Sequence, residues 1–124
     1  MALILKKDKF KEFLEILGKN YEIIAPVKEG DLINFKLLKD FSKIILDYPK
    51  TVKSPKEFLF PQSEELYKYK FSGKNVDIKP AEVDKKPKAI VAIHPCDARS
   101  ISMMDKVFNW DYSDKLYFER RKNT

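Results

Sequence analysis

The amino-acid sequence predicts an α/β or α+β fold, in which an N-terminal helix and short mixed strands precede a buried strand–loop–helix unit. Three observations support this. One amphipathic helical pattern stands near the N-terminus, two pairs of strand-like segments are joined by turn residues, and an apolar β-branched run leads directly into a second helical pattern. A chain of 124 residues with 44% hydrophobic residues can build one core, so we expect a single domain over residues 1–124. A subdivision into residues 1–84 and 88–124 follows the change of pattern.

The first predicted element is a helix over Asp8–Leu17, which Gly18 ends. Its apolar residues recur with the spacing of one helical face: Phe10, Phe13, Leu14 and Leu17.

Two strands are expected next, over Tyr21–Val27 and Leu32–Leu38, with the first ending near Pro26. Residues 28–31 contain Gly30 between charged residues and would join the two strands as a hairpin. Phe41–Leu46 is apolar and partly β-branched, which predicts a third, short strand.

The middle of the chain predicts a short helix and a second hairpin. Ser54 and Pro55 suit the cap and first position of a helix, and Pro61 keeps that helix short. Gln62–Leu66 is interpreted as a further helical turn. Aromatic residues alternate with lysines in Tyr67–Phe71, which predicts a strand. A turn follows at 72–75, and Val76–Ile78 is expected to form the second strand of the hairpin.

The character of the sequence changes after the lysine-rich linker at 85–88. Ala89–Ile93 is a continuous apolar run, which predicts a strand buried on both faces, with Val91 or Ile93 nearly inaccessible. A helix is expected to start near Asp97 and another to span Asp114–Lys122. The apolar face of the first of these helices would consist of Ile101, Met104, Val107 and Phe108.

Composition excludes several classes of protein. Cys96 is the only cysteine, so this chain alone forms no intramolecular disulfide and no four-cysteine iron–sulfur site. Three glycines and one histidine supply neither a dinucleotide or phosphate loop nor a histidine-based metal site. The four apolar residues before Lys6 are too few for a signal peptide, and no run is long enough to span a membrane. We therefore expect a cytoplasmic protein without membrane contact.

The formal charge of +6 is compatible with an acidic partner, with nucleic acid, or with solubility alone. The lysines are scattered along the whole chain, and no dense basic run carries aromatics spaced for base stacking. A basic nucleic-acid-binding module is therefore only a minor alternative, and no nucleic-acid partner is expected.

The candidate cofactor-binding residues are Cys96, Asp97 and Arg99, which follow the predicted strand and open the predicted helix. A helix N-terminus presents free N–H groups, favours a thiolate over a thiol, and with Arg99 nearby would attract an anion or a cofactor edge. The structural alternative is equally simple. Asp97 would cap the helix, Cys96 would be a small buried hydrophobe, and Arg99 would pair with Asp105 or Glu119.

Two charged segments have weaker functional interpretations. The cluster from Arg120 to Lys122 complements the C-terminal dipole of a helix, and Arg120 and Arg121 could instead dock an acidic partner. The paired carboxylates Glu64 and Glu65 are interpreted as an exposed helix face.

Three stretches of the sequence carry a family resemblance. They have the patterns S-P-K-x4-P-x2-E at 54–64, P-C-D-x-R-S-I followed by D-x-V-F within 95–108, and D-x2-Y-x2-R-R-x2-T at 114–124. In this order and spacing they resemble the iron–sulfur electron-transfer subunits of anaerobic sulfite reductases and the beta subunits of sulfhydrogenases. The resemblance spans roughly residues 21–124.

The resemblance implies that this chain is the N-terminal, cluster-free part of a larger electron-transfer subunit. Family members continue into a ferredoxin-like part with two [4Fe-4S] clusters, and they pass electrons between a flavin-bearing partner and a catalytic subunit. This sequence stops at Thr124 without those cysteines, so cluster binding is not carried over, and we expect neither a cofactor held by this chain alone nor catalysis by it. Among the candidate residues, Lys56 enters only through this resemblance.

Other subunits of a reductase or hydrogenase complex are the partners that the resemblance implies. The alternative is a stand-alone domain that binds a small ligand or a protein. If a further strand normally lies beside Ala89–Ile93, this chain would expose apolar surface or self-associate.

Overall fold

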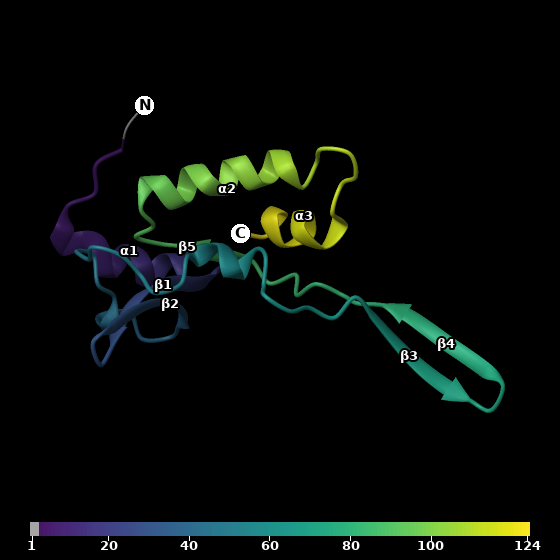
Figure 1. Ribbon diagram of the computed structural model, residues 1–124. Coiled ribbons are helices and arrows are strands. Elements are labelled where there is room, and N and C mark those ends of the chain that lie inside the picture. Colours follow the sequence, from purple (N-terminus) through teal and green to yellow (C-terminus); the bar gives the residue numbers. More distant parts are fainter. Residues whose placement is uncertain (1–2) are drawn as a thin grey trace.

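The computed structural model describes residues 3–124 and contains two small sheets and three α-helices (Figure 1). A 3₁₀ turn at Lys7–Lys9 leads into helix α1 (Phe10–Leu17), which ends at Gly18 as predicted. Leu3–Leu5 are irregular and exposed, while Ala2, the first residue of the N-terminal apolar run, lies outside the described residues. The predicted mixed α/β fold is confirmed.

The main sheet has three strands in the order β2-β1-β5. Strands β1 (Glu22–Glu29) and β2 (Leu32–Leu38) form the predicted antiparallel hairpin around Gly30, and β5 (Lys88–Ile90) runs parallel to the start of β1. Strand β1 continues through Pro26 instead of ending there. Proline lacks an N–H, but its carbonyl still accepts a hydrogen bond from Ile45 at 3.0 Å, so the strand is not interrupted.

Strand β1 is buried on both faces of this sheet. One face, with Ile23 and Ala25, packs with Leu14 of α1. The opposite face, with Ile24, packs with Phe35 and Tyr48. Two layers therefore meet at this strand, and it forms the centre of the core.

The two C-terminal helices lie above the sheet and close the fold (Figure 1). Helix α2 (Pro95–Val107) and helix α3 (Lys115–Lys122) pack through Ile101 and Tyr117 against Leu59. Leu59 follows the 3₁₀ helix Pro55–Phe58, which is as short as predicted and is capped by Ser54. Helix α3 is capped by Asp114, whose side chain accepts a hydrogen bond from the Tyr117 N–H at 2.9 Å.

The second predicted hairpin is also present. Strands β3 (Tyr67–Ser72) and β4 (Asn75–Pro80) pair around Gly73 and project away from the rest of the molecule (Figure 1).

Three predicted elements are wrong. Phe41–Leu46 is not a strand, because the Asp40 carboxylate accepts hydrogen bonds from the backbone and hydroxyl of Ser42 and starts a 3₁₀ turn. Gln62–Leu66 forms no helical turn but is irregular.

The third wrong element is the strand predicted over Ala89–Ile93, which is shorter, lies at the sheet edge and is only half-buried, including Val91 and Ile93. It ends at Ile90 because Ala92 adopts a left-handed backbone conformation with φ 58°. Val91 still donates its N–H to the Ile24 carbonyl at 2.8 Å.

Candidate functional site

The three sequence stretches that carry the family resemblance converge at one place in the fold. Leu59, Ile101 and Tyr117 come one from each stretch and form a single buried cluster. Half-buried apolar residues surround this cluster: Ile93, Met104, Phe108 and Phe118. Segments 54–64, 92–108 and 114–124 therefore fold as one packed unit, which we call the motif junction.

Polar contacts hold the motif junction together at α2 and α3. The Tyr117 ring stacks on Phe108 with centroids 4.3 Å apart, and its hydroxyl donates to Asp105 at 2.6 Å. Arg121 Nε lies 3.1 Å from the same carboxylate oxygen. Burial, followed by the hydrogen bond to Asp105, raises the pKa of Tyr117 above its usual value. The hydroxyl is thus a permanent donor near neutral pH.

The two arginines predicted to dock a partner are both engaged within this chain. Arg120 donates to the Leu59 carbonyl at 3.4 Å and forms an ion pair with Glu64, and both side chains are mostly buried. Arg121 is engaged by Asp105. Glu64 is thereby part of a structural pair and not of an exposed helix face. A docking role for these arginines remains a prediction.

The candidate cofactor residues open helix α2. His94 is the N-cap and Pro95 the first helical residue, so the prediction that Asp97 caps the helix is wrong. Asp97 lies in the first turn, where its carboxylate accepts a hydrogen bond from Ser54 Oγ at 2.8 Å. A negative charge there is favoured by the helix dipole.

Cys96 is exposed, so the structural alternative of a buried hydrophobe is wrong, and its functional role remains a prediction. Arg99 is also exposed, and within residues 3–124 it forms no ion pair with Asp105 or Glu119. The structure therefore brings Cys96 and Asp97 together at the helix start and leaves Arg99 free toward solvent.

Lys56 lies beside this region, in the 3₁₀ helix of the motif junction. It is half-buried, its N–H lies 3.5 Å from Ser54 Oγ, and its carbonyl accepts the N–H groups of Leu59 and Phe60. These contacts are all made by its backbone. Ser54 is the residue that connects this turn to Asp97, and its sequence signals were the helix-capping pattern and its place at the start of the first resemblance stretch.

Tyr48 completes this site and was missed by the sequence analysis. Its hydroxyl donates to the Ala92 carbonyl at 2.7 Å, and its ring lies against His94 with centroids 4.4 Å apart. Burial raises the pKa of Tyr48, with smaller contributions from the charges of Asp97 and Cys96. A hydrogen bond across 44 residues leaves no local sequence signal. It fixes the carbonyl of Ala92, whose left-handed conformation is costly for a residue with a Cβ.

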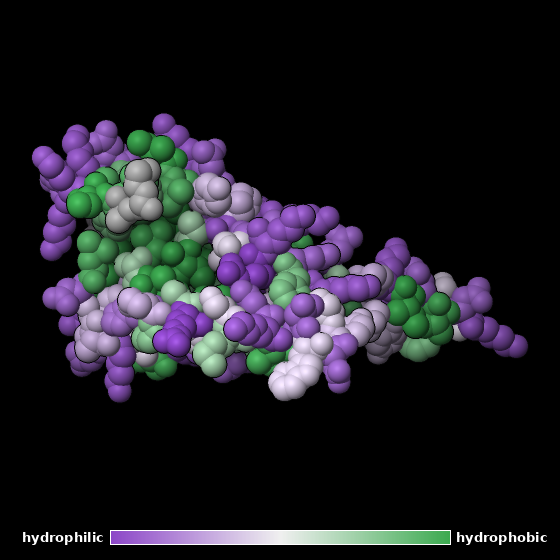
Figure 2. All heavy atoms as spheres, turned by 90° about the horizontal axis from the view of Figure 1, so that it is seen from above, coloured by the Kyte–Doolittle hydropathy of each residue, from purple (hydrophilic) through white to green (hydrophobic). Residues whose placement is uncertain are grey.

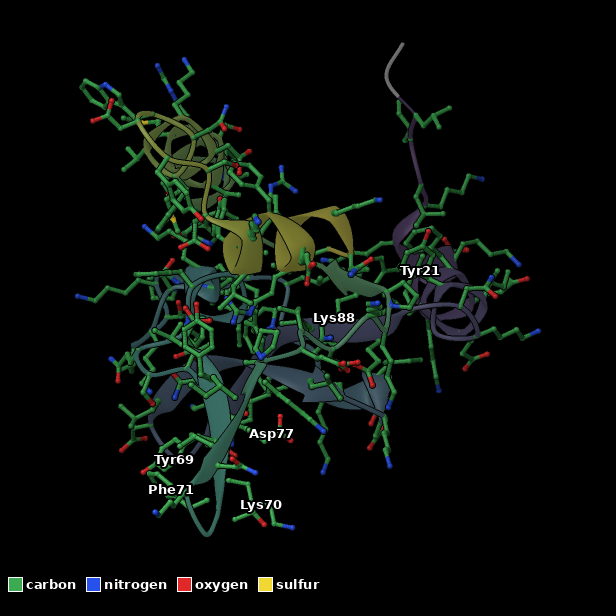
Figure 3. All side chains as sticks on the ribbon, turned by 90° about the vertical axis from the view of Figure 1, so that its right-hand side faces the viewer. Tyr21, Tyr69, Lys70, Phe71, Asp77 and Lys88 are labelled. Carbon is green, nitrogen blue, oxygen red and sulfur yellow. The ribbon has the colours of Figure 1, made fainter. Side chains whose placement is uncertain are left out.

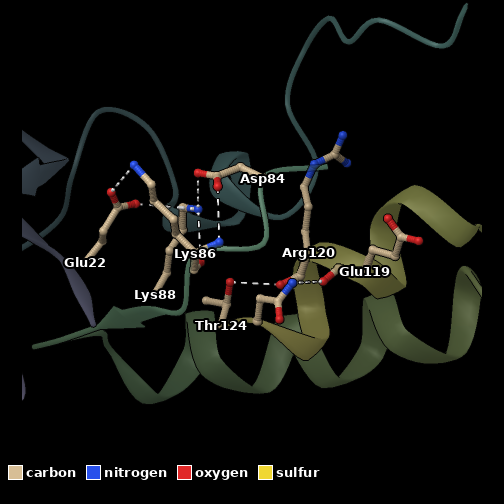
Figure 4. A network of polar contacts seen from close by, with 8 residues as sticks. Glu22, Asp84, Lys86, Lys88, Glu119, Arg120 and Thr124 are labelled. Atoms are coloured by element: carbon tan, nitrogen blue, oxygen red, sulfur yellow. Dashed lines mark hydrogen bonds and ion pairs between the residues drawn. The ribbon is translucent and has the colours of Figure 1, made fainter. Parts of the chain in front are cut away.

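A second polar region lies where α3 ends beside the start of β5 (Figure 4). The Lys88 ammonium lies 3.1 Å from Asp84 and 3.6 Å from Glu22, and the Lys88 N–H donates to the Asn123 carbonyl at 2.7 Å. A cavity of about 220 Å³ opens here, lined by Phe58, Val83, Asp84, Lys88, Arg120, Asn123 and Thr124. The Lys88–Asn123 backbone hydrogen bond attaches the end of α3 to β5, and both Lys88 and Arg120 are paired with carboxylates.

Neither region gathers metal ligands. Within residues 3–124 no group of three or more His, Cys, Asp and Glu side chains is placed to hold an ion. Over the same residues, none of the helices has the length and apolar character needed to cross a bilayer.

Comparison with known proteins agrees with the motif pattern. The chain is 29% identical over 120 residues to sulfhydrogenase 2 subunit beta from Pyrococcus furiosus. The alignment covers 96% of this chain and 34% of that relative, so the chain spans about a third of the relative's length. No family model matches the chain. No solved structure matches it significantly. The predicted resemblance to the beta subunits of sulfhydrogenases is therefore confirmed, and it extends over nearly all of this chain.

Proposed function

We propose that this chain is the cluster-free portion of an electron-transfer subunit in an oxidoreductase complex related to sulfhydrogenase. The observation that carries the proposal is the similarity to sulfhydrogenase 2 subunit beta over 96% of the chain. In this role the chain contributes a folded platform that positions neighbouring redox parts and binds other subunits.

The packing of the motif junction supports this proposal. The resemblance rested on three stretches separated by up to tens of residues, and these stretches contact one another through Leu59, Ile101 and Tyr117. A chance resemblance is not expected to involve three segments that contact one another in the folded chain. The Ser54–Asp97 hydrogen bond and the Arg120–Glu64 ion pair join residues that belong to different motifs.

Cofactor chemistry is assigned to other parts of the complex. A [4Fe-4S] cluster needs four ligands, normally cysteine thiolates, and this chain has one cysteine. We propose that the clusters are held by the C-terminal continuation that family members carry, that any flavin is held there or by a partner subunit, and that Cys96 and Asp97 face such a neighbour. A cytoplasmic location is part of the proposal, because a free exposed thiol is typical of reducing compartments.

The test is anaerobic purification of the affinity-tagged chain from its native host. We expect it to co-purify with a cysteine-rich, iron-containing subunit, and we expect the assembly to reduce a viologen dye with hydrogen. The purified chain alone should show no dye reduction. The same tag on an unrelated protein of similar charge is the control.

Two results would contradict the proposal. One is a chain that co-purifies with no iron-containing protein under any salt condition. The other is reproducible dye reduction by the isolated chain.

A further inference from the structure

The hairpin of β3 and β4, residues 67–80, is exposed along both of its strands. Every residue of both strands is exposed, and the hairpin projects from the globular part as a separate arm (Figure 1). We call it the arm. Its two strands pair only with each other. An isolated two-stranded hairpin is marginally stable in water, so an arm of this kind gains order from a surface that covers it.

The register divides the arm into two chemically distinct faces. Residues directly opposite each other share a face, and successive residues alternate between faces. One face consists of the pairs Tyr67 with Pro80, Tyr69 with Ile78, and Phe71 with Val76. Figure 3 shows Tyr69 and Phe71 on one side of the arm and Lys70 and Asp77 on the other.

The apolar face is large for a surface without a cover. Tyr67, Tyr69 and Phe71 are 66%, 69% and 67% exposed, and Ile78 is 62% exposed. With roughly 200 Å² for each aromatic side chain, this face presents on the order of 500 Å² of apolar surface. That is comparable to the largest patch on a typical monomer, and such patches mark interaction sites. Figure 2 shows a small hydrophobic area near the narrow end of the molecule.

The apolar face continues into a depression at the base of the arm. A cavity of about 360 Å³ lies between the arm and the segment that joins α2 to α3. Its lining is mostly apolar: Leu66, Tyr67, Pro80, Ala81, Tyr112 and Leu116, with Asp114 and Lys115. The base is fixed, because the Ala81 N–H donates to the Leu66 carbonyl at 2.9 Å. A cavity of this size accepts one large apolar side chain.

The opposite face and the turn make the arm strongly basic. Four lysines (68, 70, 74 and 79) against the single Asp77 give residues 67–80 a formal charge of +3. The two lysine ion pairs of this region, with Glu65 and Asp77, are largely exposed and therefore weak. Long lysine side chains on a thin hairpin reach past its edges and form a charged rim around whatever covers the apolar face.

We propose that the arm docks through its apolar face into a groove on an acidic protein, with an apolar side chain of that protein filling the cavity at its base. Carboxylates beside the groove would face the lysine rim, which speeds association and selects the partner by charge. This inference rests on the proposed function in one respect: it states how a partner would bind such a subunit.

Other occupants fit the arm less well. A second copy of this chain carries the same charge of +6, so two arms repel each other at low salt. A nucleic-acid strand would need stacked bases and neutralised phosphates together, whereas the aromatic residues and the lysines lie on opposite faces.

The test places a photo-cross-linking residue at position 71 of the full-length chain in its native host, with position 32 as matched control. Leu32 is 55% exposed and lies at the turn of the other hairpin. The cross-linked protein is identified, purified and titrated with the wild-type chain and with Tyr69→Ser/Phe71→Ser and Leu32→Ser variants. Circular dichroism checks that each variant folds.

The expected result is an acidic protein cross-linked from position 71 only. Its affinity should fall at least tenfold in the Tyr69→Ser/Phe71→Ser variant, stay unchanged in Leu32→Ser, and weaken with salt and with Lys70→Glu. The proposal is overturned if position 71 cross-links only a second copy, or nothing. It is also overturned if oligo-dT or phosphatidylserine vesicles bind the chain in an arm-dependent manner and no protein does.

These outcomes separate the arm from the proposed function. If the arm binds an acidic protein and the chain co-purifies with no redox subunit, the arm proposal is supported and the proposed function is contradicted. Unweakened co-purification of an iron-containing subunit with the Tyr69→Ser/Phe71→Ser variant would do the reverse.

Discussion

The two β-hairpins of this chain are built alike and end in opposite situations. Both are antiparallel pairs closed by a glycine in the left-handed conformation, with φ of 59° at Gly30 and 64° at Gly73. Strand β1 is buried from Ile23 to Val27, whereas both strands of the arm are exposed throughout.

The difference shows what a strand pattern does and does not encode. The sequence of β1 from Ile23 to Val27 is continuously apolar, and it is covered on both faces by parts of the same chain. The alternating pattern of β3 indicates one face that needs a cover. Within residues 3–124 that cover is not supplied, which is the reason for proposing that a partner protein covers this face.

The largest predicted effect compares an isoleucine of the buried strand β1 with an isoleucine of the arm. Ile24→Ala should lower the free energy of unfolding by about 3 kcal/mol, because Ile24 is fully buried and its loss leaves a cavity. Ile78→Ala, which removes the same atoms from the arm, should change it by less than about 0.5 kcal/mol. Urea denaturation followed by circular dichroism measures both. Equal effects of the two variants would mean that the arm is part of the cooperative core.

A smaller effect is expected at the motif junction. Tyr117→Phe should cost about 1.5 kcal/mol, because it removes the buried hydrogen bond to Asp105 and leaves that carboxylate with Arg121 alone. Tyr69→Phe is the matched control, since the Tyr69 side chain is exposed on the arm. Thermal unfolding of both variants checks this, and a stability loss in the control alone would contradict the assigned packing.

The hydrogen bond from Tyr117 to Asp105 should also make the free energy of unfolding depend on pH in alkaline solution. The pKa of Tyr117 is raised in the folded state above its usual value of 10.0, so the unfolded chain loses this proton first as pH rises. The contribution of Tyr117 is therefore complete below about pH 10 and is lost above it. Denaturation midpoints measured from pH 8 to pH 11 should fall more steeply for wild type than for Tyr117→Phe.

The turns offer a third comparison. Alanine in place of Gly30 or Gly73 meets no atom within 4 Å, so only the left-handed backbone opposes the substitution. Gly30→Ala should lower global stability by about 1 kcal/mol, because β1 and β2 form the core. Gly73→Ala should loosen the arm without moving the global unfolding midpoint. Hydrogen exchange of the arm amides detects the local change, and a shifted global midpoint for Gly73→Ala would argue against an independent arm.

Local patterns predicted most of the fold. Helix α1, both hairpins, and helices α2 and α3 follow from periodicity and turn residues that act within a few positions. Predictions failed where a single polar contact or a backbone conformation decided the outcome. Asp40 turned an apolar segment into a 3₁₀ turn, and Ala92 shortened the parallel strand.

The candidate site was only partly predictable for the same reason. Cys96 and Asp97 stand in a recognisable strand–loop–helix segment, so their place at a helix start could be foreseen. Ser54 and Tyr48 reach this segment from 43 and 44 residues away along the chain, through one hydrogen bond each. Such contacts depend on how the 3₁₀ helix packs on α2, which no local pattern encodes.

The smallest stability effect is expected at Cys96, and there the readout is chemical. Because Cys96 is exposed in the first turn of α2, Cys96→Ser should change the free energy of unfolding by less than about 0.5 kcal/mol. Iodoacetamide should alkylate the thiol in the folded protein, because the Cys96 side chain is exposed in the first turn of α2. The rate of alkylation as a function of pH, compared with a short peptide that contains the same cysteine, tests this. A faster reaction than the peptide near neutral pH would support a functional surface at the start of α2. No alkylation in the folded state would mean that Cys96 is covered, and the resemblance to sulfhydrogenase would then stand without support from this residue.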